Sequence, residues 1–173
     1  MRKNMSSEEK SILLSIPILF LFGASFHFLY EISGNNFLVG LIAPVNESVW
    51  EHTKMVVVPI ILWRSLFYLL HGKRLSIEKN PWHTGLLASL LISIISIPFL
   101  YYFYVGAFGV SILWVDILIF LISLSVGQLL GLHVYQHSHG IAYRQVVLII
   151  FFILILYFIA TVRPPNIPLF QVH

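Results

Sequence analysis

Residues 82–132 read WHTGLLASLLISIISIPFLYYFYVGAFGVSILWVDILIFLISLSVGQLLGL, and Asp116 is the only Asp, Glu, Lys or Arg among them. A helix that crosses the hydrocarbon core of a bilayer needs about 20 mostly apolar residues, so this stretch is long enough for two. The glycines of VGAFG at 105–109 favour a tight turn between the two helices. We therefore expect one membrane span at about 82–104 and the next at about 110–132.

The rest of the chain holds three further apolar runs, at about 11–30, 55–70 and 145–162. These runs are continuous rather than alternating, which favours helices over the strands of a membrane barrel. Hydrophobic residues make up 58% of the sequence and charged residues 10%, with a mean hydropathy of +0.90. Because a soluble domain carries about 25% charged residues, a soluble enzyme is excluded. The sequence predicts an all-α polytopic membrane protein, a bundle of five transmembrane helices in one integral membrane domain over 1–173.

Basic residues beside the predicted spans indicate the orientation of the chain. On one side lie Arg2, Lys3, Lys10, Lys73, Arg74, Lys79 and Arg144, and on the other Lys54 and Arg163. Because Lys and Arg are enriched in short cytoplasmic loops, we expect the N-terminus inside and the C-terminus outside. Arg64, within the second span, is expected to snorkel to the inner face. The predicted partner is the lipid bilayer, and nucleic acid is not expected.

Polar residues gather at the predicted outer ends of the first two spans. His27 and Glu31 are four residues apart and should share a helix face. Asn46 follows a proline and is a good N-cap, so the second helix is predicted to start there. Glu47 and Glu51 would then form a second pair with the same spacing. A short loop joins the two helices, so we expect these side chains to converge with a histidine at position 52.

Two chemistries are open to these polar residues. The candidate ligands for a divalent metal such as zinc or manganese are His27, Glu31 and His52. The candidate catalytic carboxylates, for general acid–base chemistry, are Glu47, Glu51 and Asp116. A purely structural role is the alternative, because Glu47 could be stabilised by a helix dipole and Glu51 could pair with Lys54.

Asp116 is expected about seven residues inside its span, roughly 10 Å deep at 1.5 Å per residue. A carboxylate at that depth costs about 2.5–3.5 kcal/mol on insertion scales, so it needs a partner within the bundle. His27 has the best-matched depth and is the predicted partner. The tyrosines at 101–104, Arg163 and a bound cation are the alternatives.

The predicted inner face carries a second group of histidines. His133 and His137 are four residues apart and could share a metal, with His139 two residues further on. Two imidazoles alone make an incomplete metal site, so a solvated, histidine-rich turn is the favoured interpretation. The predicted inner and outer groups lie about 30 Å apart across the bilayer and cannot share one ion.

Several motifs resemble a known family. They are HFLYE-x-SGN at 27–35, VG at 39–40, PVNESVWEH-x-K at 44–54, YY at 101–102, DI at 116–117 and PP-x-x-PLF at 164–170. Together they resemble a prokaryotic family of small multi-pass membrane proteins catalogued as a domain of unknown function (DUF6512). The resemblance covers most of the chain and implies a multi-pass protein of the prokaryotic cell membrane. It supports the outer polar residues, leaves out the inner histidines, and implies no activity.

Three functions follow from these observations. The first is a metal-dependent or acid–base membrane enzyme that acts on a lipid-like or small-molecule substrate, with a divalent metal as its cofactor. The second is a small transporter, or a proton or cation pathway that uses intramembrane ionisable groups. The third is a non-catalytic partner in the assembly of other membrane proteins.

Overall fold

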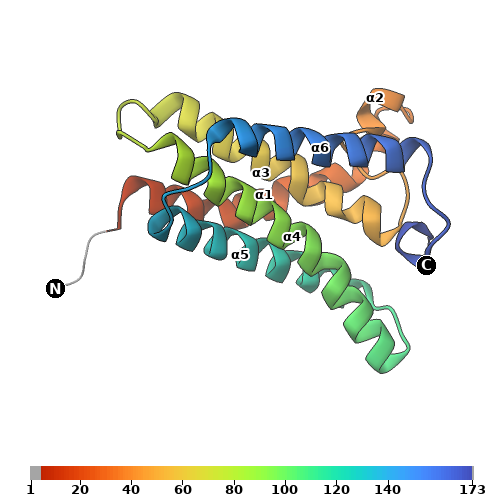
Figure 1. Cartoon of the computed structure of the whole chain (residues 1–173). Helices are drawn as coiled ribbons and strands as arrows, with labels where there is room; N and C mark the ends of the chain where they lie inside the picture. The colour runs from red at the N-terminus through yellow and green to blue at the C-terminus, as the bar shows by residue number, and fades with distance from the viewer. Residues whose placement is uncertain (1–4, 173) are drawn as a thin grey trace.

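A computed structural model describes residues 5–172 of the chain (Figure 1). In chain order its helices are α1 (Ser7–Ile32), α2 (Phe37–Gly40), α3 (Val49–His71), α4 (Lys79–Phe108), α5 (Leu113–His137), α6 (Tyr143–Val162) and the 3-10 helix η1 (Pro168–Phe170). The five helices α1, α3, α4, α5 and α6 are long and apolar enough to cross a membrane. The predicted all-α architecture with five membrane-length helices is confirmed for the described part of the chain.

The turn between α4 and α5 differs in detail from the prediction. Gly106 lies inside α4, and the helix ends at Gly109, whose φ of 70° is in the left-handed region that favours glycine. The next helix begins at Leu113, later than the predicted start at 110. One glycine therefore ends the helix, and the residues after it form a short loop.

Helices α4 and α5 lie side by side along most of their length (Figure 1). A Cβ atom at Gly85 would lie 2.6 Å from the Gly131 carbonyl oxygen, so the two backbones are too close for a larger residue. Such close approach at small residues is common between membrane helices. Towards the α4–α5 loop the pair tilts away from the other helices (Figure 1).

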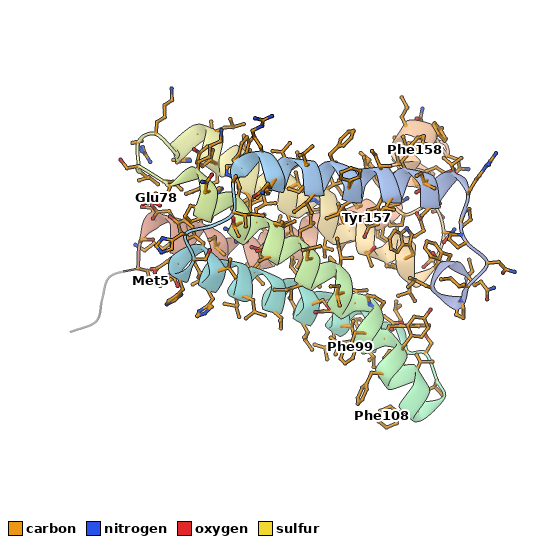
Figure 2. The ribbon with its side chains drawn as sticks, in the orientation of Figure 1. Met5, Glu78, Phe99, Phe108, Tyr157 and Phe158 are labelled. Carbon is orange, nitrogen blue, oxygen red and sulfur yellow. The ribbon has the colours of Figure 1, made fainter. Side chains whose placement is uncertain are left out.

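The bundle has a closely packed apolar centre and an apolar outer surface. Val56, Ile60, Leu90 and Leu124 are completely buried between helices. Phe99 and Phe108, in contrast, project outward from α4, and both are exposed (Figure 2). Large apolar side chains on the outside suit a helix that faces lipid, where hydrocarbon takes the place of water.

The start of α1 and the end of η1 lie at opposite ends of the bundle, as five crossings require (Figure 1). Which end faces the cytoplasm stays a prediction from the basic residues. The expectation for Arg64 is wrong, because its side chain is 0% exposed and does not reach either face. Its Nη2 atom donates to the hydroxyl of Ser89 at 3.0 Å, and the ring of Trp82 covers its guanidinium.

Candidate metal centre

The loop before α3 contains one more turn than predicted. The side chain of Asn46 accepts the Ser48 amide at 2.9 Å, and the Ser48 hydroxyl accepts the Glu51 amide at 3.3 Å. Ser48 is therefore the N-cap, and α3 begins at Val49. The predicted start at Asn46 is wrong because this asparagine closes a turn in front of the helix. Glu47 consequently precedes the helix and is free to point away from Glu51.

Glu47 lies between two histidines that come from different helices. Its Oε2 atom is 3.4 Å from Nε2 of His52 in α3 and 3.7 Å from Nε2 of His27 in α1. One ligand atom from each of the three residues lies within 4.8 Å of the other two. The histidine side chains are 30% and 32% exposed and that of Glu47 is 60% exposed. We call His27, Glu47 and His52 the His–Glu cluster.

A backbone carbonyl orients His52. Its Nδ1 atom lies 3.0 Å from the carbonyl oxygen of Ser48, one helical turn earlier. A carbonyl can only accept, so Nδ1 carries the hydrogen and donates it. In the neutral ring the lone pair is then on Nε2, the atom that faces Glu47. Histidines that bind metals are commonly held in this way, with the second ring nitrogen donating to a carbonyl or carboxylate.

Glu51 takes part in a buried ion pair instead of joining the His–Glu cluster. Its Oε2 atom is 2.6 Å from Nζ of Lys54 and accepts the Val45 amide at 2.9 Å. Nζ of Lys54 also donates to the carbonyl of Gly40 at 2.8 Å. Both charged side chains are almost completely buried. The pair therefore fastens the loop around α2 to the first turns of α3.

Glu31 also lies apart from the cluster, exposed near the end of α1. Four residues advance a helix by about 6 Å, and the Glu31 carboxylate is not among the ligand atoms that lie within 4.8 Å of one another. Of the five side chains expected to converge, the structure brings together His27, Glu47 and His52. Glu47, considered from the sequence as a catalytic base, thus takes the position among the histidines that was expected for Glu31.

Asp116 lies in the first turn of α5, where the helix dipole favours a carboxylate. The Tyr104 hydroxyl donates to its Oδ1 atom at 2.6 Å, and the Ser111 hydroxyl lies 3.5 Å from Oδ2. The predicted partner, His27, is replaced by Tyr104 because the two tilted helices place this tyrosine directly beside the loop. The carboxylate is also nearer its helix end than expected, because α5 starts at Leu113.

A cavity of about 740 Å³ connects Asp116 with the His–Glu cluster. Its polar lining residues are His27, Glu47, His52, Tyr101, Ser111 and Asp116. Most of the remaining wall is apolar and includes Phe20, Phe28, Leu113 and Phe120. This volume is within the range of about 300–1,000 Å³ that is typical of ligand sites. The cavity thus presents a few polar groups within a largely hydrocarbon wall.

The C-terminal segment supports the loop from the other side. Val172 forms an isolated antiparallel bridge with Ser48, whose carbonyl orients His52. The ring of Phe170 lies 4.9 Å from that of Trp50, measured between centroids. This support was not expected from the sequence, whereas Tyr104 is one of the tyrosines expected as alternative partners of Asp116. The proline-rich PP-x-x-PLF motif at 164–170 was the available signal, because such a segment turns back and does not continue a helix.

The second group of histidines lies at the opposite end of α5. His133 and His137 stack at 4.2 Å between ring centroids, and Nδ1 of His137 lies 2.9 Å from the His133 carbonyl oxygen. Both side chains are exposed, as is that of His139. Within residues 5–172, the His–Glu cluster is the group of at least three His, Asp or Glu side chains with the geometry for a metal ion.

Comparison with known proteins gives one match. No curated protein and no solved structure matches this chain. A family model, described as "Family of unknown function (DUF6512)", matches residues 1–173, and the chain therefore belongs to this family.

Proposed function

We propose that this protein is a metal-dependent enzyme of the cell membrane that acts on a lipid-like substrate at the extracytoplasmic face. The observation that carries the proposal is the convergence of ligand atoms from His27, Glu47 and His52 within 4.8 Å. These atoms come from two different helices and the loop between them, at the edge of a mostly apolar cavity. The bundle would thus hold a metal where a membrane lipid can approach it.

Two of the three spacings in the cluster suit zinc. A tetrahedral zinc ion with ligands at 2.0–2.1 Å holds its ligand atoms about 3.3 Å apart. The distances from Glu47 Oε2 to the two histidine Nε2 atoms are 3.4 and 3.7 Å. Two histidines and one glutamate leave the fourth position of the metal for a water molecule, which is the pattern of catalytic rather than structural zinc. A metal held by His27, Glu47 and His52 would supply an activated water as a nucleophile near neutral pH.

The cavity supports the choice of substrate. An acyl or prenyl chain would find apolar contacts with Phe20, Phe28 and Phe120, while the ester or phosphoester group next to it would lie near the His–Glu cluster. Asp116 lines the same cavity and is oriented by Tyr104. We assign Asp116 the role of exchanging a proton with the leaving group, as a positioned carboxylate does in general acid–base catalysis.

A cation pathway is the second candidate. It is favoured by the buried polar side chains of Ser93, Ser123 and Gln128, further along α4 and α5. The guanidinium of Arg64, which donates to the neighbouring Ser89, places a positive charge beside this row and opposes the passage of a cation. The enzyme is therefore the better-supported proposal.

Metal binding is tested first, on purified protein in lipid nanodiscs. We expect the chelator-treated protein to bind zinc in a 1:1 ratio, measured by calorimetry and by elemental analysis. His27→Ala and Glu47→Gln should each weaken binding by about 100-fold or more, since even residues behind the ligands are worth 10–100-fold. Glu31→Gln and His133→Ala are the matched controls and should bind zinc as the unaltered protein does. Equal zinc binding by all five proteins would overturn the metal site.

Activity is tested next, with phospholipids and prenyl phosphates presented in the same nanodiscs and followed by mass spectrometry. We expect turnover of one lipid class that stops on chelation and returns with zinc. Zinc-dependent movement of cations across vesicles, without lipid turnover, would favour the pathway instead. Zinc binding with neither activity would overturn both and leave the non-catalytic assembly partner.

A further inference from the structure

Arg64 occupies the centre of a second polar region, near the opposite end of the bundle from the His–Glu cluster. Its side chain is completely enclosed by protein. The ring centroid of Trp82 lies 4.9 Å from the guanidinium carbon, and the Trp82 indole donates to the Arg64 carbonyl at 3.1 Å. A Cβ atom at Gly131 would lie 3.0 Å from Nη2, so this glycine makes room for the guanidinium.

Hydrogen bonds satisfy one side of this guanidinium. Nη2 donates to the Ser89 hydroxyl at 3.0 Å, and that hydroxyl donates to Oε1 of Gln128 at 3.5 Å. This chain of donors directs the amide nitrogen of Gln128 away from Ser89. We call Arg64, Ser89 and Gln128 the buried arginine site.

The remaining groups of the site are all donors. Nε and Nη1 of Arg64 and Nε2 of Gln128 are buried and have no hydrogen-bond partner within residues 5–172. None of the ion pairs of the described chain includes Arg64. Buried charges in proteins are normally paired, because an isolated charge in a medium of low dielectric constant is costly. An acceptor that also carries negative charge would satisfy these donors and compensate the buried charge together.

We propose that the buried arginine site binds a small monovalent inorganic anion, chloride under physiological conditions. A water molecule would supply an acceptor but would leave the positive charge uncompensated. A lipid phosphate would bring its glycerol and acyl chains with it, whereas Arg64 and Gln128 are both 0% exposed. Chloride bound here would link the α3 guanidinium to the α5 amide and would stabilise the three-helix contact among α3, α4 and α5.

The proposal is tested by equilibrium binding of radioactive chloride to the purified full chain in nanodiscs. We expect one chloride per chain, displaced by unlabelled chloride or bromide but not by gluconate. The melting temperature should be about 5–10 °C higher in saturating bromide than in gluconate of equal ionic strength, as expected for a ligand at roughly 100 times its Kd. Equal melting temperatures in the two salts, together with no specific chloride binding, would overturn the proposal.

Two variants separate loss of binding from loss of folding. Gln128→Glu places a carboxylate beside the guanidinium, so we expect it to keep the fold, lose chloride binding and melt at the same temperature in both salts. Arg74→Gln removes an exposed arginine and should keep both chloride binding and the salt effect. Chloride binding that persists in Gln128→Glu would contradict the assignment. Zinc binding at the His–Glu cluster should be unchanged in both variants, so failure of either proposal leaves the other intact.

Discussion

The His–Glu cluster and the buried arginine site are opposite in chemistry. The cluster brings lone pairs together, from two imidazole nitrogens and a carboxylate. The arginine site has buried N–H donors without a partner, on a guanidinium and an amide. Each region therefore favours an ion of the opposite charge, a metal cation in the first and an anion in the second.

The two regions also differ in access. His27 and His52 are about one-third exposed and border a cavity, whereas Arg64 is completely enclosed. Under these proposals a ligand at the cluster would exchange and meet a substrate, while an ion beside Arg64 would be held between packed helices. If both proposals hold, exposure as much as charge separates a site for turnover from a site for stability.

The prediction with the largest effect concerns membrane topology, because a reporter fusion lies on either one side of the membrane or the other. It tests whether the two regions lie at opposite sides of the membrane. We expect reporter fusions after Lys79 and at the C-terminal end of the sequence to report opposite compartments, with Lys79 in the cytoplasm, because basic residues favour that side. The measurement is the activity of paired reporters, one active only in the cytoplasm and one only outside. The same compartment for both fusions would remove the topological basis of the comparison.

The largest effect on stability is expected at the buried ion pair of Glu51 and Lys54, where each charge already has its partner. Glu51→Gln leaves Lys54 buried without a counter-charge and should lower the free energy of unfolding by about 3–5 kcal/mol. Glu47→Gln, at an exposed carboxylate, should change it by less than about 1 kcal/mol in the absence of metal. Denaturant titration of the purified variants measures both. Similar values for the two would mean that Glu51 and Glu47 do not differ as their burial indicates.

Asp116→Asn separates the binding of a metal from the turnover of a lipid substrate. The asparagine oxygen can still accept from the Tyr104 hydroxyl, so we expect zinc affinity and melting temperature to stay unchanged. Lipid turnover should fall by about 100-fold, because the proton carrier is lost. Steady-state kinetics and zinc calorimetry on the same sample make the comparison. Normal turnover would remove Asp116 from the proposed mechanism.

The smallest effect is expected at the C-terminal segment. Phe170→Ala removes the ring next to Trp50 and should cost about 1 kcal/mol of stability, as aromatic pairs do. The zinc affinity should fall measurably but by less than about tenfold, because Ser48 and its carbonyl lose support but remain present. Phe108→Ala, at an exposed position on α4, is the matched control. An unchanged zinc affinity in Phe170→Ala would show that the segment does not influence the cluster.

The architecture could be predicted from the sequence because uncharged runs of membrane length leave few alternatives. The arrangement of the His–Glu cluster was harder to predict from the sequence. The spacing of Glu47 and Glu51 implies a shared face only if one helix includes both residues. Ser48 and not Asn46 is the N-cap, so Glu47 lies outside the helix. Spacing along one helix also does not reveal which face meets a neighbouring helix.

Arg64 illustrates the same limit. A lone arginine in an apolar run is expected to reach for the membrane surface. Arg64 instead lies inside the bundle, because Ser89 accepts its hydrogen bond and Gly131, more than sixty residues later in the chain, leaves room for its guanidinium. Such long-range contacts depend on how α3, α4 and α5 meet, which the sequence pattern of α3 alone does not contain.

The bridge between Ser48 and Val172 has a consequence for biogenesis. Ribosomes make the chain from its N-terminus, so α1 and α3 emerge well before Val172 and are separated from it by three further membrane helices. The carbonyl that orients His52 thus receives its final support only after those helices have been inserted. A newly made α1–α3 hairpin would carry the ligands in a loosely held loop, and metal loading would be favoured late in assembly, once the bundle has closed around it.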